Sequence, residues 1–192
     1  MGRFHHTGNR FLHNQMLIYL DANLVQYCAD YEEFIFGDSS TSPVNDAKLL
    51  RELTALRRLV EIEQLGTDWT FAAPLHLMNE LLGGIPRPDQ RRVYTVLLES
   101  WQDSDWQVSI AASEDRFLSI VDSLYALNLK DSADKRHLAE AIVLGASWLL
   151  TNDKNIINRT RQKPEIIGNV QGVRIARPSE CLEEITTGLF LK

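Results

Sequence analysis

The stretch MLIYLD, residues Met16–Asp21, is an apolar run that ends in a carboxylate. The stretch WLLTND, residues Trp148–Asp153, repeats this arrangement near the other end of the chain. Continuous apolar runs of this length are typical of strands buried in a parallel sheet. Ligand sites in open α/β sheets gather where such strands end. The two stretches therefore predict neighbouring buried strands, with a functional site at their carboxyl ends.

The rest of the chain alternates between candidate helices and strands. Ser42 and Pro43 are typical of a helix cap and a first helical position, and they predict the start of a helix that ends near Gly66. The apolar face of this helix is Leu49, Leu53, Leu56 and Val60. Further helices are expected over Asn23–Asp30, from Pro74 to Gly84, over Pro88–Trp101, from Phe117 to Leu127, over Asp131–Ala146, after Asp153 and after Pro178.

Further strands are expected at Trp69–Ala73, Trp106–Ile110 and Val173–Ala176, with a loop around Pro164 and Gly168. Strands and helices that alternate at this spacing favour a parallel sheet with helices on both faces. The expected fold is therefore a three-layer α/β/α sandwich with a central, mainly parallel sheet.

The length and composition indicate one domain. The chain has 192 residues, 44% of them hydrophobic, which is enough to bury a full core over residues 16–192. Residues 1–15 are polar and basic, and a disordered extension is favoured over a metal-binding tract despite three histidines. The longest apolar stretch, Ala141–Leu150, is about half of what a bilayer helix needs. Cys28 and Cys181 lack CxxC spacing, so a soluble protein of the reducing cytoplasm is expected.

The net charge of −6 argues against a protein that coats nucleic acid nonspecifically. A local basic groove stays possible, because two clusters of basic residues lie close to acidic candidates. From Asp153 to Arg177 the basic residues outnumber Asp153 and Glu165, and they are Lys154, Arg159, Arg161, Lys163, Arg174 and Arg177. The second cluster is Arg87, Arg91 and Arg92. For either cluster the alternative is an ordinary solvated helix face.

Four acids, Asp21, Glu80, Asp134 and Asp153, each lie at a strand end or in the first turns of a helix. Mg²⁺ and Mn²⁺ take oxygen ligands, so four convergent carboxylates suit such a cation. Without a cation the carboxylates would repel one another and some would bind protons. A pair of metals held there would activate water for in-line attack on a phosphodiester and stabilise the leaving oxygen. The alternative for each acid alone is a helix cap that complements the helix dipole.

Three segments together resemble the PIN-domain nucleases. They are LIYLDANLVQY (Leu17–Tyr27), PLHLMNELL (Pro74–Leu82) and DKRHLAEAIVLGASWLLTND (Asp134–Asp153), and the resemblance extends over roughly Met16 to Ala176. It implies a PIN-like fold and an endoribonuclease in which Asp21, Glu80, Asp134 and Asp153 bind Mg²⁺ or Mn²⁺ and carry catalysis. In the family, residues at the positions of Asn23 and Thr151 support these acids by hydrogen bonding.

The resemblance also implies RNA, single-stranded or structured, as the substrate, with Lys154, Arg159 and Arg161 as candidate contacts to it. A homodimer and an antitoxin protein are the implied partners. The chain would be either the toxin of a toxin–antitoxin pair or a stand-alone RNA-processing enzyme. The connection between Asp21 and Glu80 is longer than in the compact toxin members of the family.

Four polar residues near these acids receive other interpretations. Asp131 is expected to cap the helix that carries Asp134. Glu140 is expected to be a solvated acid on a helix face, because it lies six positions from Asp134. His76 and His137 are expected to be surface or packed histidines rather than metal ligands.

Three other functions stay open. A phosphatase with an aspartyl nucleophile also begins with an acid after the first strand, although Asn23 stands where its second aspartate would be. A non-catalytic PIN-fold interaction module would keep the fold without the chemistry. A DNA nuclease would share the site and differ only in its substrate.

Overall fold

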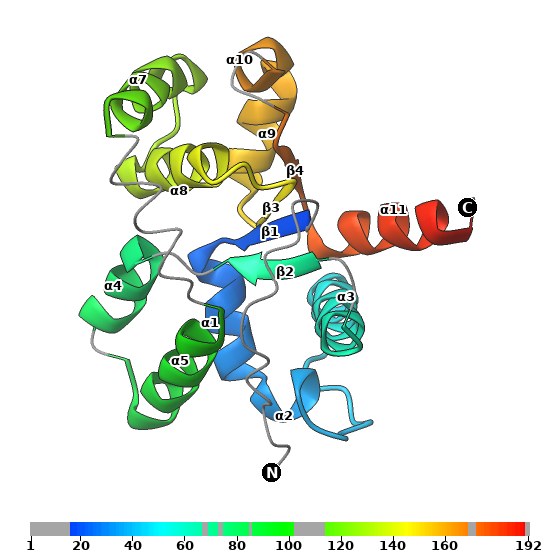
Figure 1. Ribbon diagram of the computed structural model, residues 1–192. Helices are drawn as coiled ribbons and strands as arrows, with labels where there is room; N and C mark the ends of the chain where they lie inside the picture. The colour runs from blue at the N-terminus through cyan, green and yellow to red at the C-terminus, as the bar shows by residue number, and fades with distance from the viewer. Residues whose placement is uncertain are drawn as a thin grey trace.

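The computed structural model describes residues 16–66, 69–72, 75–84, 86–101, 114–168 and 172–190. The fold is α/β, and the described strands form one parallel sheet with helices on both of its faces (Figure 1). The strands are β1 (Met16–Leu20), β2 (Trp69–Ala72), β3 (Trp148–Leu150) and β4 (Arg174–Ala176). The helices before β3 are α1 (Ala22–Asp30), α2 (Glu32–Ile35), α3 (Ala47–Gln64), α4 (Leu75–Gly83), α5 (Pro88–Trp101), α7 (Glu114–Leu124), the 3₁₀ helix η1 (Tyr125–Leu127) and α8 (Ser132–Val143). The later helices are α9 (Lys154–Gln162), α10 (Pro164–Gly168) and α11 (Pro178–Phe190).

The strand order β2-β1-β3-β4 places β1 in the middle of the sheet. Ile18 is the register partner of Phe71 on one side and of Trp148 on the other, and all pairs are parallel. The chain therefore leaves β1 toward one edge of the sheet and later crosses back to the other side of β1. The space between the carboxyl ends of β1 and β3 is consequently a topological switch point, where open α/β sheets bind their ligands.

Alternate residues of β1 belong to two separate cores. Ile18 and Leu20 pack in the cluster that includes residues of α1, α3 and α5, whereas Leu17 and Tyr19 pack in the cluster that includes residues of α7 and α8. This two-residue alternation is what a strand covered on both faces requires. The arrangement fits the expected three-layer sandwich, and Tyr19 brings a fully buried hydroxyl into the second core.

Several predicted elements are confirmed. Helix α5 has the expected bounds, α7 continues into η1 as far as Leu127, and α11 begins at Pro178. The parallel strands β1 and β3 lie where the two apolar runs predicted them. The predicted strand at Trp106–Ile110, the ends at Ala73 and Pro74, and the extension over residues 1–15 lie outside the described residues.

The predicted start of α3 was wrong. Asp46, not Ser42, is the N-cap, because its carboxylate accepts hydrogen bonds from the backbone nitrogens of Lys48 (2.8 Å) and Leu49 (3.2 Å). The Ser42 hydroxyl instead donates to the carbonyl oxygen of Val44 at 2.7 Å. A carboxylate that satisfies two free backbone donors is the stronger start signal.

Two boundaries further along the chain also differ from the predictions. Helix α8 stops at Val143, because Gly145 adopts a positive φ of 67° and Ala146 donates to the carbonyl oxygen of Ala141 at 2.9 Å. This pairing is the Schellman ending that glycine favours. The segment Pro164–Gly168, expected to be a loop, is the short helix α10, with proline at its first position.

Among the described helices, none has the length and apolar character needed to cross a bilayer.

Replacing Leu56 by alanine tests the core on the α3 side of the sheet. Leu56 is fully buried, so its truncation should lower the free energy of unfolding by about 2–5 kcal/mol in urea titrations. The matched control is Leu118→Ala in α7, where the side chain is 53% exposed and the change should be below about 0.5 kcal/mol. Equal losses in the two variants would contradict the described packing of α3.

Candidate functional site

Asp21, Glu80, Asp134 and Asp153 line a single pocket of about 450 Å³. They come from four separate segments: the end of β1, helix α4, the first turn of α8 and the turn before α9. The arrowheads of β1 and β2 in Figure 1 point toward the side where α1 and α4 begin. The structure therefore brings all four predicted acids together at the carboxyl ends of the strands.

Asp21 is the most firmly held of the four acids. Its side chain accepts hydrogen bonds from the Thr151 hydroxyl (2.6 Å), the Asn23 amide (2.5 Å) and the Ala22 backbone nitrogen (2.8 Å). Asp21 is only 5% exposed, and this burial raises the pKa of its carboxyl group, although the nearby His137 and the hydrogen bonds oppose the shift. Asn23 and Thr151 thus orient the carboxylate, as expected of supporting residues.

Thr151 also connects the first and last acids. Its hydroxyl oxygen accepts a hydrogen bond from the Asp153 backbone nitrogen at 2.9 Å while the hydroxyl donates to Asp21. Asp153 is the N-cap of α9 and accepts from the backbone nitrogens of Asn155 (2.5 Å) and Ile156 (3.3 Å) through one oxygen, Oδ1. Asp153 therefore both caps α9 and lines the pocket, and its Oδ2 atom takes no part in the cap.

The pKa of Asp134 responds both to its burial and to the acids around it. Partial burial raises the pKa of its carboxyl group to about 6, and the charges of Asp153, Asp21 and Asp131 add to the shift. Asp131 caps α8 by accepting from the Ala133 backbone nitrogen at 2.9 Å, as predicted, but it also lines the pocket. Ionising Asp134 in the folded protein therefore costs free energy, because the group is partly buried and other acids surround it.

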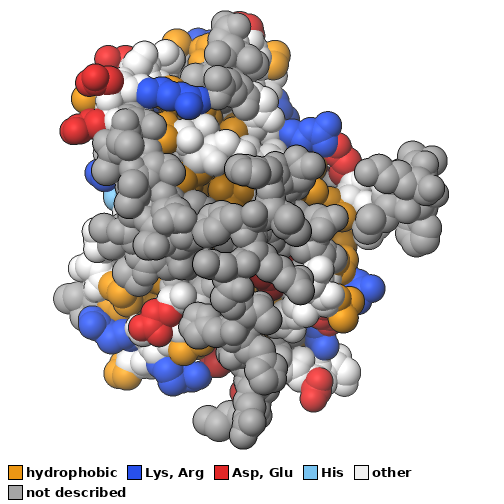
Figure 2. Space-filling model, viewed as in Figure 1, with side chains coloured by type: hydrophobic (Ala, Val, Ile, Leu, Met, Phe, Trp, Pro, Cys, Tyr) orange, Lys and Arg blue, Asp and Glu red, His pale blue; other side chains and the backbone are white. Residues whose placement is uncertain are grey.

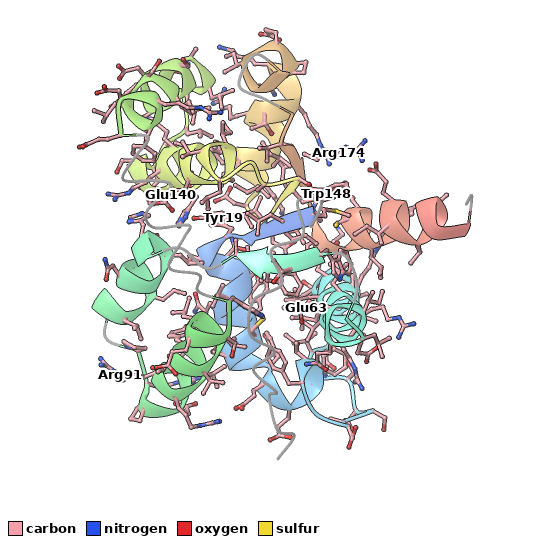
Figure 3. The ribbon with its side chains drawn as sticks, in the orientation of Figure 1. Tyr19, Glu63, Arg91, Glu140, Trp148 and Arg174 are labelled. Atoms are coloured by element: carbon pink, nitrogen blue, oxygen red, sulfur yellow. The ribbon has the colours of Figure 1, made fainter. Side chains whose placement is uncertain are left out.

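A buried chain of polar groups lies behind Glu80. The Nε2 atom of His137 is 2.8 Å from Glu80 Oε2, and its Nδ1 atom is 2.7 Å from the Tyr19 hydroxyl. That hydroxyl donates to Glu140 Oε2 at 2.9 Å, and Figure 3 shows Tyr19 and Glu140 close together between β1 and α8. Burial alone would lower the pKa of His137, but the hydrogen bond to Glu80 and the surrounding acids outweigh it, so the pKa is raised.

The prediction that Glu140 is a solvated acid was wrong. Glu140 is 2% exposed and faces the sheet, where Tyr19 donates to it and Arg136 lies 3.6 Å away. Burial raises the pKa of its carboxyl group, and the hydrogen bond from Tyr19 opposes this shift. Its partner was hidden from sequence reasoning, because Tyr19 stands in a run that reads as purely apolar.

Sequence reasoning also gave too little weight to the two histidines of the site. His137 is packed, as expected, but it lines the pocket and contacts Glu80. His76 lies one turn before Glu80, with its Nε2 atom 3.9 Å from Glu80 Oε2 and its ring centroid 5.3 Å from that of His137. Burial lowers the pKa of His76 to about 4, and the charge of Arg136 adds to this effect. The available signal was the position of both histidines within the segments that carry Glu80 and Asp134.

Most residues of the two basic clusters have partners outside the pocket. Arg161 donates to both carboxylate oxygens of Glu180 at 2.8 Å, and Arg174 pairs with Glu184 and stacks over Trp148 (Figure 3). In the other cluster, Arg87 pairs with Asp30 and Arg92 with Glu32. On the face in Figure 2, basic side chains form small separate groups, several of them beside acidic ones.

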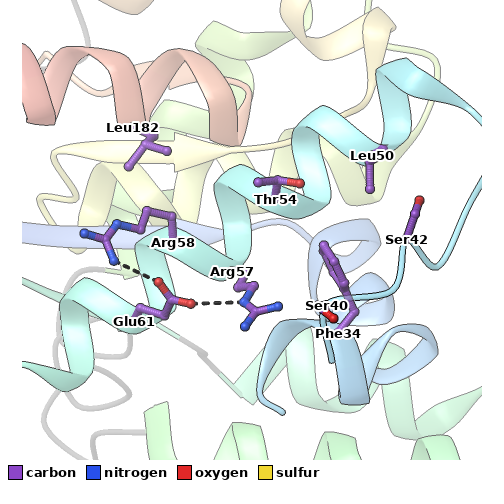
Figure 4. Close-up of a pocket in the computed structure, with 9 residues that line it drawn as sticks. All are labelled: Phe34, Ser40, Ser42, Leu50, Thr54, Arg57, Arg58, Glu61 and Leu182. Atoms are coloured by element: carbon purple, nitrogen blue, oxygen red, sulfur yellow. Dashed lines mark hydrogen bonds and ion pairs between the residues drawn. The ribbon is translucent and has the colours of Figure 1, made fainter. Parts of the chain in front are cut away.

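Within the described part of the chain, Lys154 and Arg159 are the predicted substrate contacts that make no ion pair. Lys154 is exposed and follows Asp153 directly, which places its backbone beside the pocket. A second pocket, of about 550 Å³, is lined by α3, by α2 and the segment between these two helices, and by Leu182 of α11 (Figure 4). Its two arginines, Arg57 and Arg58, both pair with Glu61, and it contains none of the four predicted acids.

Comparisons of the chain with protein-family models, with curated proteins and with solved structures give no match. The function is therefore inferred from the geometry of the pocket and the chemistry of its residues.

The raised pKa of Asp134 makes a prediction about stability and pH. A carboxyl group whose pKa rises from 3.8 to about 6 on folding binds its proton more tightly in the folded state. Asp134 therefore contributes a loss of stability as pH rises from about 4 to 7, and Asp134→Asn does not suffer this loss. At pH 7.5 in EDTA the variant should be more stable by about 1 kcal/mol, after allowance for solvent screening.

Urea unfolding at pH 4, 5.5 and 7.5 measures this difference, which should shrink toward zero at pH 4. The matched control is Asp122→Asn on the exposed face of α7, which should change stability by less than about 0.5 kcal/mol at any of these pH values. An Asp134→Asn variant that is no more stable than wild type at pH 7.5 would show that the acids do not repel one another as described.

Proposed function

We propose that this chain is a Mg²⁺- or Mn²⁺-dependent endoribonuclease that hydrolyses phosphodiester bonds in the pocket lined by Asp21, Glu80, Asp134 and Asp153. One observation carries the proposal: four carboxylates from four separate segments converge at the topological switch point of a parallel sheet. Such a concentration of acids lowers the stability of the folded protein, and groups that do so are typical of functional sites.

The donor set fits a hard divalent cation. The four acids offer only oxygen atoms, which Mg²⁺ and Mn²⁺ prefer. Asp21 is held by three hydrogen bonds, so its carboxylate is already oriented before a cation arrives. Burial raises the pKa of Asp134, and the charges of Asp153, Asp21 and Asp131 add to this shift; a cation in the pocket would offset both effects. Residues Asp21, Glu80, Asp134 and Asp153 would hold the metal.

The reaction requires little further chemistry from the protein. Water attacks the phosphorus atom, one P–O bond forms and another breaks, and a proton passes to the leaving oxygen. A bound divalent cation supplies activation of the water and neutralisation of the phosphate charge. The protein contributes a rigid set of oxygen ligands, with Thr151 and Asn23 orienting Asp21. The exposed Lys154 beside Asp153 is suited to contact the phosphate backbone.

The PIN-like character of the fold belongs to the same proposal. It is supported by the parallel sheet with helices on both faces and by the position of Asp21 and Asp153 after neighbouring strands β1 and β3. RNA as the substrate, and an antitoxin or a second copy as a partner, follow from the resemblance of the three segments to that family.

An aspartyl-nucleophile phosphatase suits the geometry less well. Both side-chain oxygens of Asp21 accept hydrogen bonds, and the residue is 5% exposed, so it is poorly placed to attack a phosphorus atom. Asn23 donates its amide to Asp21 and has no carboxyl group with which to act as an acid or base.

Cleavage of a labelled mixed-sequence RNA tests the proposed function. The wild type should cut the RNA with Mg²⁺ or Mn²⁺ and not with EDTA. Asp134→Asn should lower the rate about 100-fold or more, because a ligand for the cation is lost. Asp134→Asn is the sharpest variant, since it is expected to be more stable than the wild type, and lost activity cannot then be attributed to unfolding.

The matched control is Asp122→Asn, which removes an equal charge from the exposed face of α7 and should cleave as the wild type does. A parallel reaction with single-stranded DNA separates a ribonuclease from a DNA nuclease. Cleavage that persists in EDTA, or in Asp134→Asn, would contradict the proposal. Folded wild type that binds Mg²⁺ and cuts neither nucleic acid would favour the non-catalytic interaction module.

A further inference from the structure

Two histidines meet on the inner side of Glu80, beside the four-acid pocket. His76 belongs to α4 and His137 to α8, and one ligand atom from each histidine and from Glu80 all lie within 4.8 Å of one another. His137 is 1% exposed, and both histidine rings come from helices that flank the pocket. The three side chains thus offer two imidazoles and one carboxylate to a common point.

The hydrogen bonds around Tyr19 indicate which nitrogen of His137 carries the hydrogen when the ring is neutral. With Glu140 ionised, the Tyr19 hydroxyl donates to Glu140 and its oxygen accepts from His137, so Nδ1 is the nitrogen that carries the hydrogen. In a neutral ring, Nε2 then presents its lone pair to Glu80 Oε2 at 2.8 Å. Two electron-rich atoms at this distance require a cation between or beside them, either a proton or a metal ion.

The same arrangement is common around metal-bound histidines. A histidine that ligates a metal through one nitrogen usually donates the other N–H to an oxygen atom that is itself tied to a carboxylate or the backbone. Here the Tyr19 hydroxyl and Glu140 provide that oxygen and that carboxylate. The orientation of His137 is therefore already the one that a metal ligand needs.

His76 supplies a second, independent observation. Its Nε2 atom is buried and has no hydrogen-bond partner among the described residues, although Glu80 Oε2 is 3.9 Å away. Buried polar nitrogens are nearly always satisfied, so one that is not needs an explanation. Coordination by Nε2 would satisfy it and would also draw His76, Glu80 and His137 together.

We propose that His76, Glu80 and His137 form a second metal site, which binds a transition-metal ion such as Zn²⁺ through two imidazoles and one carboxylate. Imidazole nitrogen suits Zn²⁺ and its neighbours, whereas Mg²⁺ prefers oxygen alone, so the two sites differ in the ion they select. Three protein ligands leave a coordination position open, as in zinc sites that bind water or substrate. The site shares Glu80 with the four-acid pocket but requires no nuclease activity.

The composition of the chain permits a clean test. It contains five histidines, and three of them, His5, His6 and His13, lie in residues 1–15. The full-length chain with these three replaced by alanine keeps His76 and His137 as its only imidazoles. Cys28 and Cys181 are both buried, and burial raises the pKa of each thiol, so neither competes for the metal as a thiolate.

Zn²⁺ is titrated into this chain in excess Mg²⁺, and the histidine ring signals are followed by NMR spectroscopy while calorimetry gives the affinity. The expected result is that one equivalent of Zn²⁺ shifts the ring signals of both histidines away from their positions in Mg²⁺ alone. Ring signals of His76 and His137 that stay unchanged with Zn²⁺ would overturn the proposal. Because this readout uses the unmodified site, it does not depend on how well a site variant folds.

Two variants locate the ligands and their support. His76→Gln should abolish the shift of His137 at one equivalent of Zn²⁺, and Tyr19→Phe should weaken Zn²⁺ binding by about 10- to 100-fold because the orienting hydrogen bond is lost. Asp153→Asn, which removes a carboxylate of the four-acid pocket and none of the three proposed Zn²⁺ ligands, should retain the Zn²⁺ shift. A His76→Gln chain that binds Zn²⁺ as tightly as its parent would overturn the assignment.

Failure here is distinguishable from failure of the proposed function. A chain that binds Zn²⁺ at the two histidines and cleaves no nucleic acid would contradict the nuclease and support this site. A chain that cleaves RNA with Mg²⁺ while Zn²⁺ leaves both ring signals unchanged would contradict this site alone.

Discussion

The parallel pairing of β1 with β3 is the constraint on which the rest of the site depends. Leu20 pairs with Leu150, and the next backbone nitrogen, that of Asp21, donates to the Leu150 carbonyl oxygen at 3.0 Å. This register places the Thr151 hydroxyl within 2.6 Å of the Asp21 carboxylate. A slip of one residue would turn Tyr19 out of its core and separate Thr151 from Asp21. The register of the sheet therefore determines the geometry of the site.

The site also shows why the apolar layers must be extensive. Burial raises the pKa of Asp21, and burial together with the surrounding acids raises that of Asp134 to about 6, so ionising these two groups works against folding at neutral pH. Stability has to come from the two cores on either side of the sheet, where residues such as Leu20 and Leu149 are fully buried. A pocket that reduces stability in this way is characteristic of functional sites rather than of packing.

Much of this arrangement could be predicted from the sequence. The buried strands could be recognised as apolar runs. Because the carboxyl ends of parallel strands lie at one edge of a sheet, Asp21 and Asp153 could be placed together from the pattern alone. Helix α5 was predictable because Pro88 and the apolar spacing up to Trp101 agree. Local signals of this kind are strong when several of them point to the same boundary.

The remainder depended on contacts that sequence spacing does not encode. Glu140 and His137 owe their roles to the hydroxyl of Tyr19, which is 121 and 118 positions away in the chain. The basic cluster after Asp153 looked available for nucleic acid, but Arg161 is occupied by Glu180, a residue of the later helix α11. Ser42 was the predicted cap of α3, and only the folded geometry shows that Asp46 satisfies the backbone donors instead.

Thermal unfolding with and without Mg²⁺ tests most directly whether the four carboxylates form a cation site. A ligand that binds only the folded state raises the midpoint of unfolding, Tm. In metal-free buffer at pH 7.5, Asp134→Asn should unfold at a higher temperature than the wild type, and millimolar Mg²⁺ should raise the Tm of the wild type far more than that of the variant. Equal Tm values for the wild type with and without Mg²⁺, or an equal rise in both proteins, would contradict the existence of the site.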